Sequence, residues 1–231
     1  YALTVGDQFV KTGLYKNVLV VGAEMHSMGL DFTTRGRNVT VIFGDGAGAV
    51  VLQPTTDLNS GILATKLHAN GTHAEELAMI NFGCHGGRWL GKERFGYEQV
   101  EYGGTYITKK MVDDEDVFPN MNGPLVFKTA VVKFPEVIRE VLAEKKLQTT
   151  DISMLIPHQA NLRISQFVQK SLGLRDDQVW NNIQKYGNTT AASVPIALTE
   201  AFEAGKIRPG DLVCLAAFGS GFTWGSALIR F

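Results

Sequence analysis

The stretch Ile152-Ser153-Met154-Leu155-Ile156-Pro157-His158-Gln159-Ala160-Asn161 decides the fold, because an apolar run stops at a proline and polar side chains follow at once. The apolar run predicts a buried strand, and Pro157, which lacks a backbone N–H, is expected to end it. Apolar residues at helical spacing from Leu162 to Leu172 predict a helix directly afterwards. A strand followed by a helix is typical of an open α/β sheet, in which ligands and catalytic groups collect at the carboxyl ends of the strands. His158 is therefore a candidate catalytic residue, with a purely structural histidine as the alternative.

Length and composition indicate an ordinary globular protein with one large α/β domain or two similar small ones. The chain has 231 residues, of which 45% are hydrophobic and 19% are charged, and its formal net charge is −1. No basic face or charge run indicates nucleic acid or an anionic membrane as a partner. No apolar segment reaches the roughly 18 residues of a membrane span and no signal peptide is recognised, so we expect a cytoplasmic protein. Cys84 and Cys214 form no metal-ligand spacing.

The first residues are apolar at helical spacing, with neither an initiator methionine nor an N-cap ahead of them. We therefore expect the chain to begin inside a helix that ends near Gly13. An apolar strand from Val18 to Val21 follows, and a second strand system is expected from Thr40 to Leu52. Gly44-Asp45-Gly46-Ala47-Gly48 interrupts this system, and glycine there permits a tight turn or a close backbone approach.

The second part of the chain alternates helices and strands. Its expected elements, in chain order, are a helix over 128–147 broken only by Pro135, the strand and helix around His158, a loop of small residues over 186–193, a helix over 194–204, and strands over 212–218 and 223–231. The last two strands are joined across Gly219-Ser220-Gly221, which predicts a hairpin with an exposed backbone.

Residues 83–116 differ in character, because they mix glycines, aromatic residues and charges without a clean period. A surface hairpin or loop is the first interpretation, and a mobile lid over a binding site is the alternative. Cys84 and His85 are adjacent there. Neighbouring residues seldom direct their side chains at each other, so we do not expect a Cys-His dyad.

Three loops carry polar groups that suit one kind of chemistry: the loop of His158 and Asn161, the loop of Asn188, and the Ser220 turn. If the loops converge, they supply an imidazole, a carboxamide and backbone N–H groups, which suit the stabilisation of an oxyanion or an enolate. No carboxylate is evident beside His158, which favours a hydrogen-bond donor over the base of a catalytic triad. The missing element is a nucleophile.

Five motifs stand in a fixed order along the chain. They are Arg35-Gly36, Phe43-Gly44-Asp45-Gly46-Ala47-Gly48-Ala49, Pro157-His158-Gln159-Ala160-Asn161-Leu162-Arg163-Ile164, Tyr186-Gly187-Asn188-Thr189-Thr190-Ala191-Ala192-Ser193-Val194-Pro195 and Phe218-Gly219-Ser220-Gly221-Phe222-Thr223-Trp224-Gly225. Together they closely resemble β-ketoacyl-acyl carrier protein synthase III, and the resemblance covers nearly the whole chain except residues 83–116. It implies a thiolase fold of two similar halves in layered αβαβα form. Residues 1–127 would be the remainder of an incomplete N-terminal half and residues 128–231 the C-terminal half.

The resemblance implies decarboxylative Claisen condensation of an acyl-CoA primer with malonyl-ACP, which gives 3-oxoacyl-ACP and initiates fatty acid synthesis. Family members use a Cys-His-Asn site, and His158 and Asn188 fall on its histidine and asparagine. These two side chains would donate hydrogen bonds to the malonyl thioester and its enolate, and the Ser220 N–H would contribute to an oxyanion hole. The residues that fall on the channel for coenzyme A and pantetheine are Arg35, Gly36, Phe127, Asn161 and Arg163. Coenzyme A thioester and the ACP phosphopantetheine would be substrates, with no tightly bound cofactor, no metal, and a homodimer as the assembly.

Two departures from the family bear on activity. The family's nucleophilic cysteine lies a few residues before the segment that Tyr1-Ala2-Leu3 resembles, so this chain alone is expected to be inactive. Cys84 falls in the 83–116 insertion, and Cys214 lies in an apolar strand where an inert buried thiol is expected. Pro124 stands where the family usually carries an asparagine that contacts pantetheine.

Other functions stay open on the sequence. One is a synthase III-like acyltransferase of secondary metabolism. Another is a non-catalytic fragment that binds pantetheine or dimerises while a different chain supplies the chemistry. A Cys-His-Asn hydrolase fits less well, because it would make no use of the channel residues.

Overall fold

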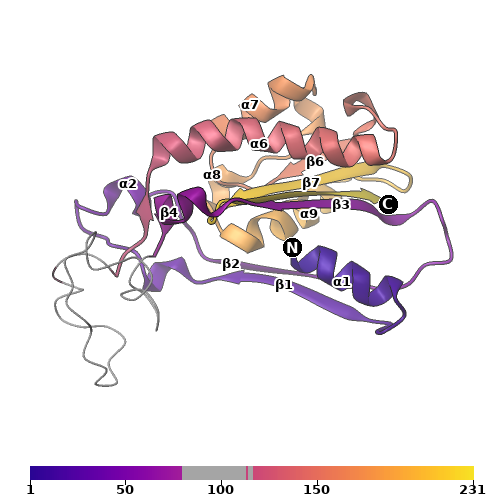
Figure 1. Ribbon diagram of the computed structural model, residues 1–231, viewed down its shortest axis with the longest axis horizontal. Helices are drawn as coiled ribbons and strands as arrows, with labels where there is room; N and C mark the ends of the chain where they lie inside the picture. Colours follow the sequence, from indigo (N-terminus) through magenta and orange to yellow (C-terminus); the bar gives the residue numbers. More distant parts are fainter. Residues whose placement is uncertain (80–112, 114–116) are drawn as a thin grey trace.

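The computed structural model describes residues 1–79, 113 and 117–231, which form stacked layers of helices and sheets (Figure 1). The helical layers contain α6 (Gly123–Glu144) and α7 (Leu162–Leu172) on one side of the four-stranded sheet, and α1 (Ala2–Lys11) and α9 (Ser193–Glu203) on the other. A four-stranded sheet lies between these helical layers, and a two-stranded sheet covers the other side of α1 and α9. This arrangement confirms the predicted layered α/β class.

The four-stranded sheet positions the stretch around His158. Its strands, in spatial order, are β3 (Gly61–Ala69), β8 (Thr223–Arg230), β7 (Leu212–Gly219) and β6 (Met154–Pro157). β6 and β7 are parallel, whereas β7 with β8 and β8 with β3 are antiparallel. Because parallel strands end at the same edge of a sheet, the residues after β6 lie beside the end of β7.

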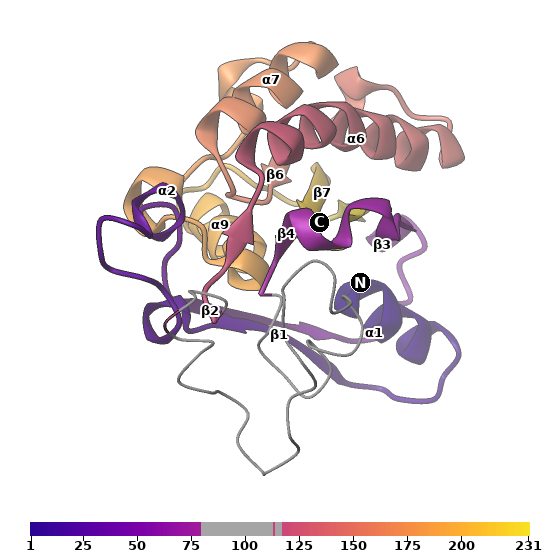
Figure 2. The same cartoon turned by 60° about the vertical axis from the view of Figure 1, so that its left-hand side comes forward.

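The second sheet pairs β1 (Val18–Glu24) with β2 (Gly46–Leu52) in antiparallel register. Its inner face packs against α1 and α9, and Figure 2 shows α9 lying between β6 and β2. Alternate residues of both strands point outward. The outward residues Leu19, Val21 and Val51 leave an exposed apolar face on this side of the described structure.

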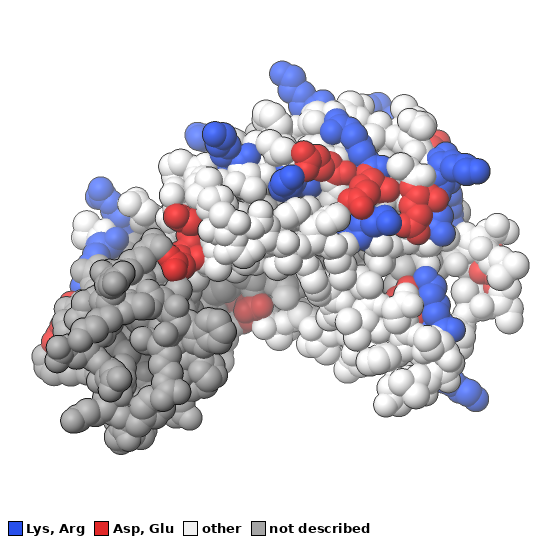
Figure 3. All heavy atoms as spheres, in the orientation of Figure 1, with Lys and Arg blue, Asp and Glu red and all other residues white. Residues whose placement is uncertain are grey.

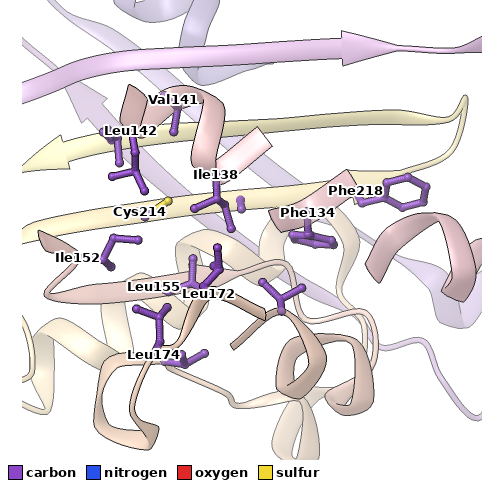
Figure 4. Close-up of a cluster of buried hydrophobic side chains, with 14 of the residues drawn as sticks. Phe134, Ile138, Val141, Leu142, Ile152, Leu155, Leu172, Leu174, Cys214 and Phe218 are labelled. Atoms are coloured by element: carbon purple, nitrogen blue, oxygen red, sulfur yellow. The ribbon is translucent and has the colours of Figure 1, made fainter. Parts of the chain in front are cut away.

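Each face of the four-stranded sheet has its own apolar core, and β7 contributes to both. Leu212, Cys214, Ala216 and Phe218 face the cluster formed with α6 and α7, which Figure 4 shows in close-up. Val213 and Leu215 face the cluster formed with α9. A strand buried on both faces has an almost continuous apolar sequence, which explains why residues 212–218 show no polar alternation.

Several element boundaries agree with the sequence-based expectations and others differ for identifiable reasons. The helix after His158 spans Leu162–Leu172 as predicted. α6 begins before the expected residue 128, because the Asn122 side chain caps it by accepting from Leu125 N–H at 3.3 Å. Pro135 lies inside this helix and does not end it.

Three further outcomes concern Pro157, residues 40–43 and β3. Pro157 is the last residue of β6, as expected, and its missing N–H is tolerated there because β6 is an edge strand. Residues 40–43 are not a strand: α2 (Arg37–Thr40) and a turn precede β2. β3 was not expected at all. Because β3 pairs with β8, the four-stranded sheet contains strands from both sides of the boundary expected between residues 127 and 128. The division of the chain into two halves at this boundary stays a prediction.

The shorter elements connect these layers. They are η1 (His26–Met28), η2 (Gly71–Glu76), β4 (Leu77–Ala78), β5 (Asn120–Met121), η3 (Thr149–Asp151), η4 (Asp176–Gln178), α8 (Ile183–Tyr186) and η5 (Thr190–Ala192). The hypotheses for residues 83–116 and for the Cys84-His85 pair fall outside the described residues, apart from residue 113.

The surface carries mixed charges on the face shown in Figure 3, where basic and acidic side chains alternate over the upper layer. Among the described residues, ion pairs join Lys66 Nζ to Glu144 Oε2 and Lys133 Nζ to Glu136 Oε2, each at 2.7 Å. Among the helices in the described ranges, none is both long and apolar enough to cross a bilayer.

Candidate active site

His158 directly follows β6 and is held by contacts from two neighbouring elements. Its backbone N–H donates to Ala216 O of β7 at 2.8 Å, which continues the parallel pairing past Pro157. Its side-chain Nδ1 lies 2.6 Å from the hydroxyl oxygen of Ser193, the first residue of α9. Both the backbone and the ring are therefore fixed, and the ring is only partly exposed, toward the cavity described below.

Burial determines the charge of this ring. It lowers the pKa of His158 from 6.5 to about 4, because a buried environment disfavours the imidazolium. At neutral pH the ring is therefore uncharged, with one N–H donor and one lone pair. Such a ring stabilises a developing negative charge by donating a hydrogen bond.

Asn188 lies in the loop between α8 and η5, and its backbone is clamped by the segment before β2. Its N–H donates to Ile42 O at 2.8 Å, and its carbonyl oxygen accepts from Gly44 N–H at 2.9 Å. A Cβ on Gly44 would lie 2.1 Å from Tyr186 O, so this approach requires glycine. The predicted close backbone approach at this glycine motif is confirmed.

The side chain of Asn188 is buried and oriented by one hydrogen bond. Its Oδ1 accepts from the backbone N–H of Thr190 at 2.8 Å. With the oxygen engaged in this way, the amide nitrogen is the end left to donate to another molecule. Thr190 has a φ of 42°, which is uncommon for a β-branched residue, so the surrounding structure holds this turn in a strained conformation.

One cavity brings together most of the candidate residues. His158 and Asn188 line it with the Ser220 turn, and Phe127, Asn161 and Arg163 lie on its wall. Ser220 is exposed at the junction of β7 and β8, where Thr223 Oγ1 donates to Ser220 O at 2.9 Å and stabilises the turn. The three loops that the sequence singled out therefore open onto the same cavity.

The candidate channel residues have separate structural roles in this arrangement. Asn161 caps α7, because its Oδ1 accepts from Arg163 N–H at 2.9 Å. Arg163 itself is exposed at the cavity wall. Pro124 occupies the first turn of α6, where its missing N–H is tolerated, and Phe127 follows one turn later.

Arg35 and Gly36 do not line this cavity. Arg35 Nε donates to Asp31 Oδ2 at 2.7 Å, and this bond is the main reason why the pKa of Asp31 falls to about 2. The guanidinium also lies 5.7 Å from the ring centroid of Phe118. A Cβ on Gly36 would lie 2.0 Å from Asp31 O, so the loop itself requires this glycine.

The cysteine that the structure describes is not a nucleophile. Cys214 is fully buried in β7, its Sγ lies 3.4 Å from Ser226 Oγ, and burial raises the pKa of its thiol to about 12. A thiol in that state is neither ionised nor accessible at neutral pH, as expected from the sequence. Cys84 lies outside the described residues. Within residues 1–79, 113 and 117–231, no cluster of three or more His, Cys, Asp or Glu side chains could hold a metal.

Sequence reasoning missed three residues that shape the site. Gln159 is buried beside His158, Ser193 contacts the imidazole, and His26 lines the same cavity. The Nε2 atom of His26 lies 3.3 Å from Thr190 Oγ1, next to the turn that orients Asn188. Gln159 and Ser193 both lie inside quoted motifs, so only their roles were missed. His26 lies in none, and no local pattern indicates that it meets a loop so distant in sequence.

Comparisons with known proteins agree on one family. The profile described as 3-oxoacyl-[acyl-carrier-protein] synthase III matches residues 1–71, and that of its C-terminal part matches residues 142–231. The chain is 41% identical over 231 residues to β-ketoacyl-[acyl-carrier-protein] synthase III of Salmonella arizonae, and equally to that of Escherichia coli K12. In both cases the match covers 100% of this chain and 63% of the relative, so the chain spans less than two thirds of their length.

Solved structures give the same result. The 3-oxoacyl-[acyl-carrier-protein] synthase III of Aquifex aeolicus is similar with a TM-score of 0.82 and 40% identity, covering 100% of this chain and 63% of that one. The enzyme of Thermus thermophilus is similar with a TM-score of 0.82 and 36% identity, and the match covers 100% of this chain and 64% of that one. A priming β-ketosynthase from the R1128 polyketide pathway is similar with a TM-score of 0.78 and 28% identity, and the match covers 100% of this chain and 61% of that one.

Proposed function

The chain belongs to the 3-oxoacyl-[acyl-carrier-protein] synthase III family, which is thiolase-like in fold, and on this premise we propose that the full-length protein initiates fatty acid synthesis. The reaction is the decarboxylative Claisen condensation of an acyl-CoA primer with malonyl-ACP to give 3-oxoacyl-ACP. The observation that carries the proposal is the presence of a neutral imidazole, His158, and an oriented carboxamide, Asn188, on one cavity.

The two side chains act on the malonyl thioester. The bond between the α-carbon and the carboxylate breaks, CO2 leaves, and the electron pair moves onto the thioester oxygen as an enolate. Hydrogen bonds from the His158 ring and the Asn188 amide stabilise that oxygen as its charge develops. The enolate carbon then attacks the enzyme-bound acyl thioester, and the cysteine thiolate leaves.

This sequence of steps needs a cysteine that accepts the primer. Cys214 cannot serve, because its thiol is buried and protonated. The proposal therefore requires a thiol from outside the described residues, and the family resemblance points to a cysteine ahead of Tyr1 in the full-length protein. During acyl transfer to that thiol, the backbone N–H of Ser220 would hold the tetrahedral oxyanion.

The cavity wall suits the carrier of the acyl group. Arg163 on this wall can pair with phosphate, and Phe127 and Asn161, which line the same cavity, would contact the pantetheine arm. Arg35 and Gly36 stay candidates for the coenzyme A end, although they lie away from this cavity. Acyl-CoA and acyl carrier protein are then the partners, and a cytoplasmic homodimer is the expected form of the enzyme.

The proposal is tested in the full-length protein by measuring two half-reactions separately. His158→Ala and Asn188→Ala should each lower malonyl-ACP decarboxylation by about 100-fold to 1,000-fold, which is typical for the loss of one oxyanion donor. Acylation of the cysteine by acyl-CoA should be largely retained. His68→Ala and Asn59→Ala are the controls, because neither residue lines the cavity; Asn59 is exposed and His68 is half-buried. Decarboxylation near the wild-type rate in either site variant would overturn the donor assignment.

A second candidate is an acyltransferase of secondary metabolism, which the similarity to the priming polyketide ketosynthase favours. It uses the same cavity but delivers the acyl group to a different acceptor. Product analysis separates the two functions: 3-oxoacyl-ACP from malonyl-ACP supports the condensing enzyme, whereas an ester or amide formed from a hydroxyl or amine acceptor supports the alternative.

A further inference from the structure

Ser193 makes two contacts that together determine the direction of its hydrogen bonds. Its side chain is 2% exposed, and its Oγ lies 2.6 Å from His158 Nδ1 and 3.3 Å from the backbone nitrogen of Gln159. A backbone N–H can only donate, so the serine oxygen accepts from Gln159. The remaining question is which atom receives the hydroxyl proton.

Within residues 1–79, 113 and 117–231, His158 Nδ1 is the only other hydrogen-bond partner of this hydroxyl. If Nδ1 carried a proton, the hydroxyl would accept twice and its own hydrogen would be buried without an acceptor, which is unfavourable. If Nδ1 carries the lone pair, both the hydroxyl of Ser193 and the backbone N–H of Gln159 are satisfied. The hydroxyl of Ser193 therefore donates to Nδ1.

The proton of the neutral imidazole must then lie on the other nitrogen. We propose that Ser193 is a positioning residue that selects the Nε2–H tautomer of His158, so that Nε2 donates into the cavity. Nε2 has no partner in the described part of the chain and is free for a ligand. The catalytic meaning of this tautomer rests on the function proposed above, in which Nε2–H is the donor to the thioester oxygen.

The inference also restricts what His158 can do. Its lone pair lies on Nδ1 and is already engaged by Ser193, while the nitrogen facing the cavity carries a proton. His158 then cannot take a proton from a thiol on the cavity side without first exchanging its own. It acts as a hydrogen-bond donor, and the cysteine must lose its proton by another route.

The direct test is NMR of the full-length protein labelled with 15N-histidine, because the shifts of the two ring nitrogens distinguish the tautomers. The wild type should show the Nε2–H form of His158 at neutral pH. Ser193→Ala should convert part or all of that signal to the Nδ1–H form and lower kcat for malonyl-ACP decarboxylation about tenfold or more, with KM nearly unchanged. Ser193→Thr, which keeps the hydroxyl, should restore both.

Ser165→Ala is the matched control, because it also removes a buried hydroxyl from the first turn of a helix, there bonded to Asn181 at 2.6 Å. It should leave the His158 signal unchanged. An Nδ1–H form in the wild type, or an unchanged tautomer in Ser193→Ala, would overturn the proposal. The wild-type spectrum decides the matter even if a variant fails to fold. This spectrum does not depend on enzymatic activity. A protein that shows the Nε2–H form but lacks condensing activity would therefore refute the proposed function and leave the tautomer assignment standing.

Discussion

Gln159 offers the sharpest test of how the loops of the site are held together. Its side chain is 3% exposed and bonds four backbone groups. Nε2 donates to Pro157 O at 2.8 Å and to Trp180 O at 3.3 Å, while Oε1 accepts from Asn182 N–H at 2.9 Å and Ile183 N–H at 3.1 Å. One amide thus joins the end of β6 to the segment that leads through α8 to Asn188.

Replacing Gln159 with methionine keeps the length of the side chain but removes all four bonds. Each neutral hydrogen bond contributes about 1 kcal/mol net, and the bond to Trp180 O is long, so we expect a loss of roughly 3–4 kcal/mol in the free energy of unfolding. That is a large part of the stability of a typical protein, which is about 5–15 kcal/mol. Catalytic decarboxylation should fall as well, because the loops of His158 and Asn188 lose their common anchor.

Urea unfolding of the full-length variants measures this loss, and two other glutamines provide graded controls. Gln178 is buried but makes two bonds, to Ile152 O at 2.6 Å and from Arg175 N–H at 3.1 Å, so its methionine variant should lose about 2 kcal/mol. Gln184 makes one exposed bond of 3.3 Å, and its variant should stay within about 0.5 kcal/mol of the wild type. If Gln159→Met were no less stable than Gln184→Met, the role assigned to the four bonds would be wrong.

Three other predictions concern the charge, the channel and the backbone of the site. Because the pKa of His158 is about 4 in the folded protein and 6.5 when unfolded, the unfolded chain binds the extra proton, and stability should be lost as the pH falls from 6.5 to 4. This loss in the free energy of unfolding, at most about 3 kcal/mol, should be absent from His158→Gln when the variant and the wild type are compared by urea unfolding across that pH range. The same dependence of stability on pH in both proteins would contradict the prediction. Arg163→Ala should weaken acyl-CoA binding about tenfold in calorimetric titration, whereas the control Arg208→Ala should not; unchanged affinity would assign Arg163 a structural role only. Gly36→Ala should destabilise the protein by about 1–3 kcal/mol in thermal unfolding, because the added Cβ meets Asp31 O, and an unchanged melting temperature would show that the loop yields freely.

Local patterns predicted the parts of the fold that depend on neighbouring residues. The amphipathic repeat defined the helix Leu162–Leu172 at both ends, and the apolar runs located β6, β7 and β8. β3 was missed because its residues are mostly half-buried and mixed in polarity, and its partner β8 lies far along the chain. The position of β6 at the edge of the sheet explains why Pro157 is tolerated in this strand, and only the complete topology shows that position.

The candidate site shows the same division. His158 and Asn188 could be named from the sequence because short motifs contain them. The contacts that orient these two residues could not be predicted from the sequence, because the contacts join segments that are remote along the chain. Ser193 bonds His158 from another helix, and Ile42 and Gly44 bond Asn188 from a turn before β2. Local sequence therefore indicated which residues take part, and packing determined how each one is oriented.

The contact between Gly44 and Asn188 has a consequence for the order of events in folding. The turn that clamps Asn188 is made early in synthesis, whereas Asn188 emerges much later, so the clamp closes only after most of the chain is available. Contacts between such distant segments form slowly, because a long loop must be closed first. We therefore expect the geometry of the candidate site around Asn188 to be among the last features to form. Chains that have already acquired native secondary structure would then pass through a period of inactivity during refolding.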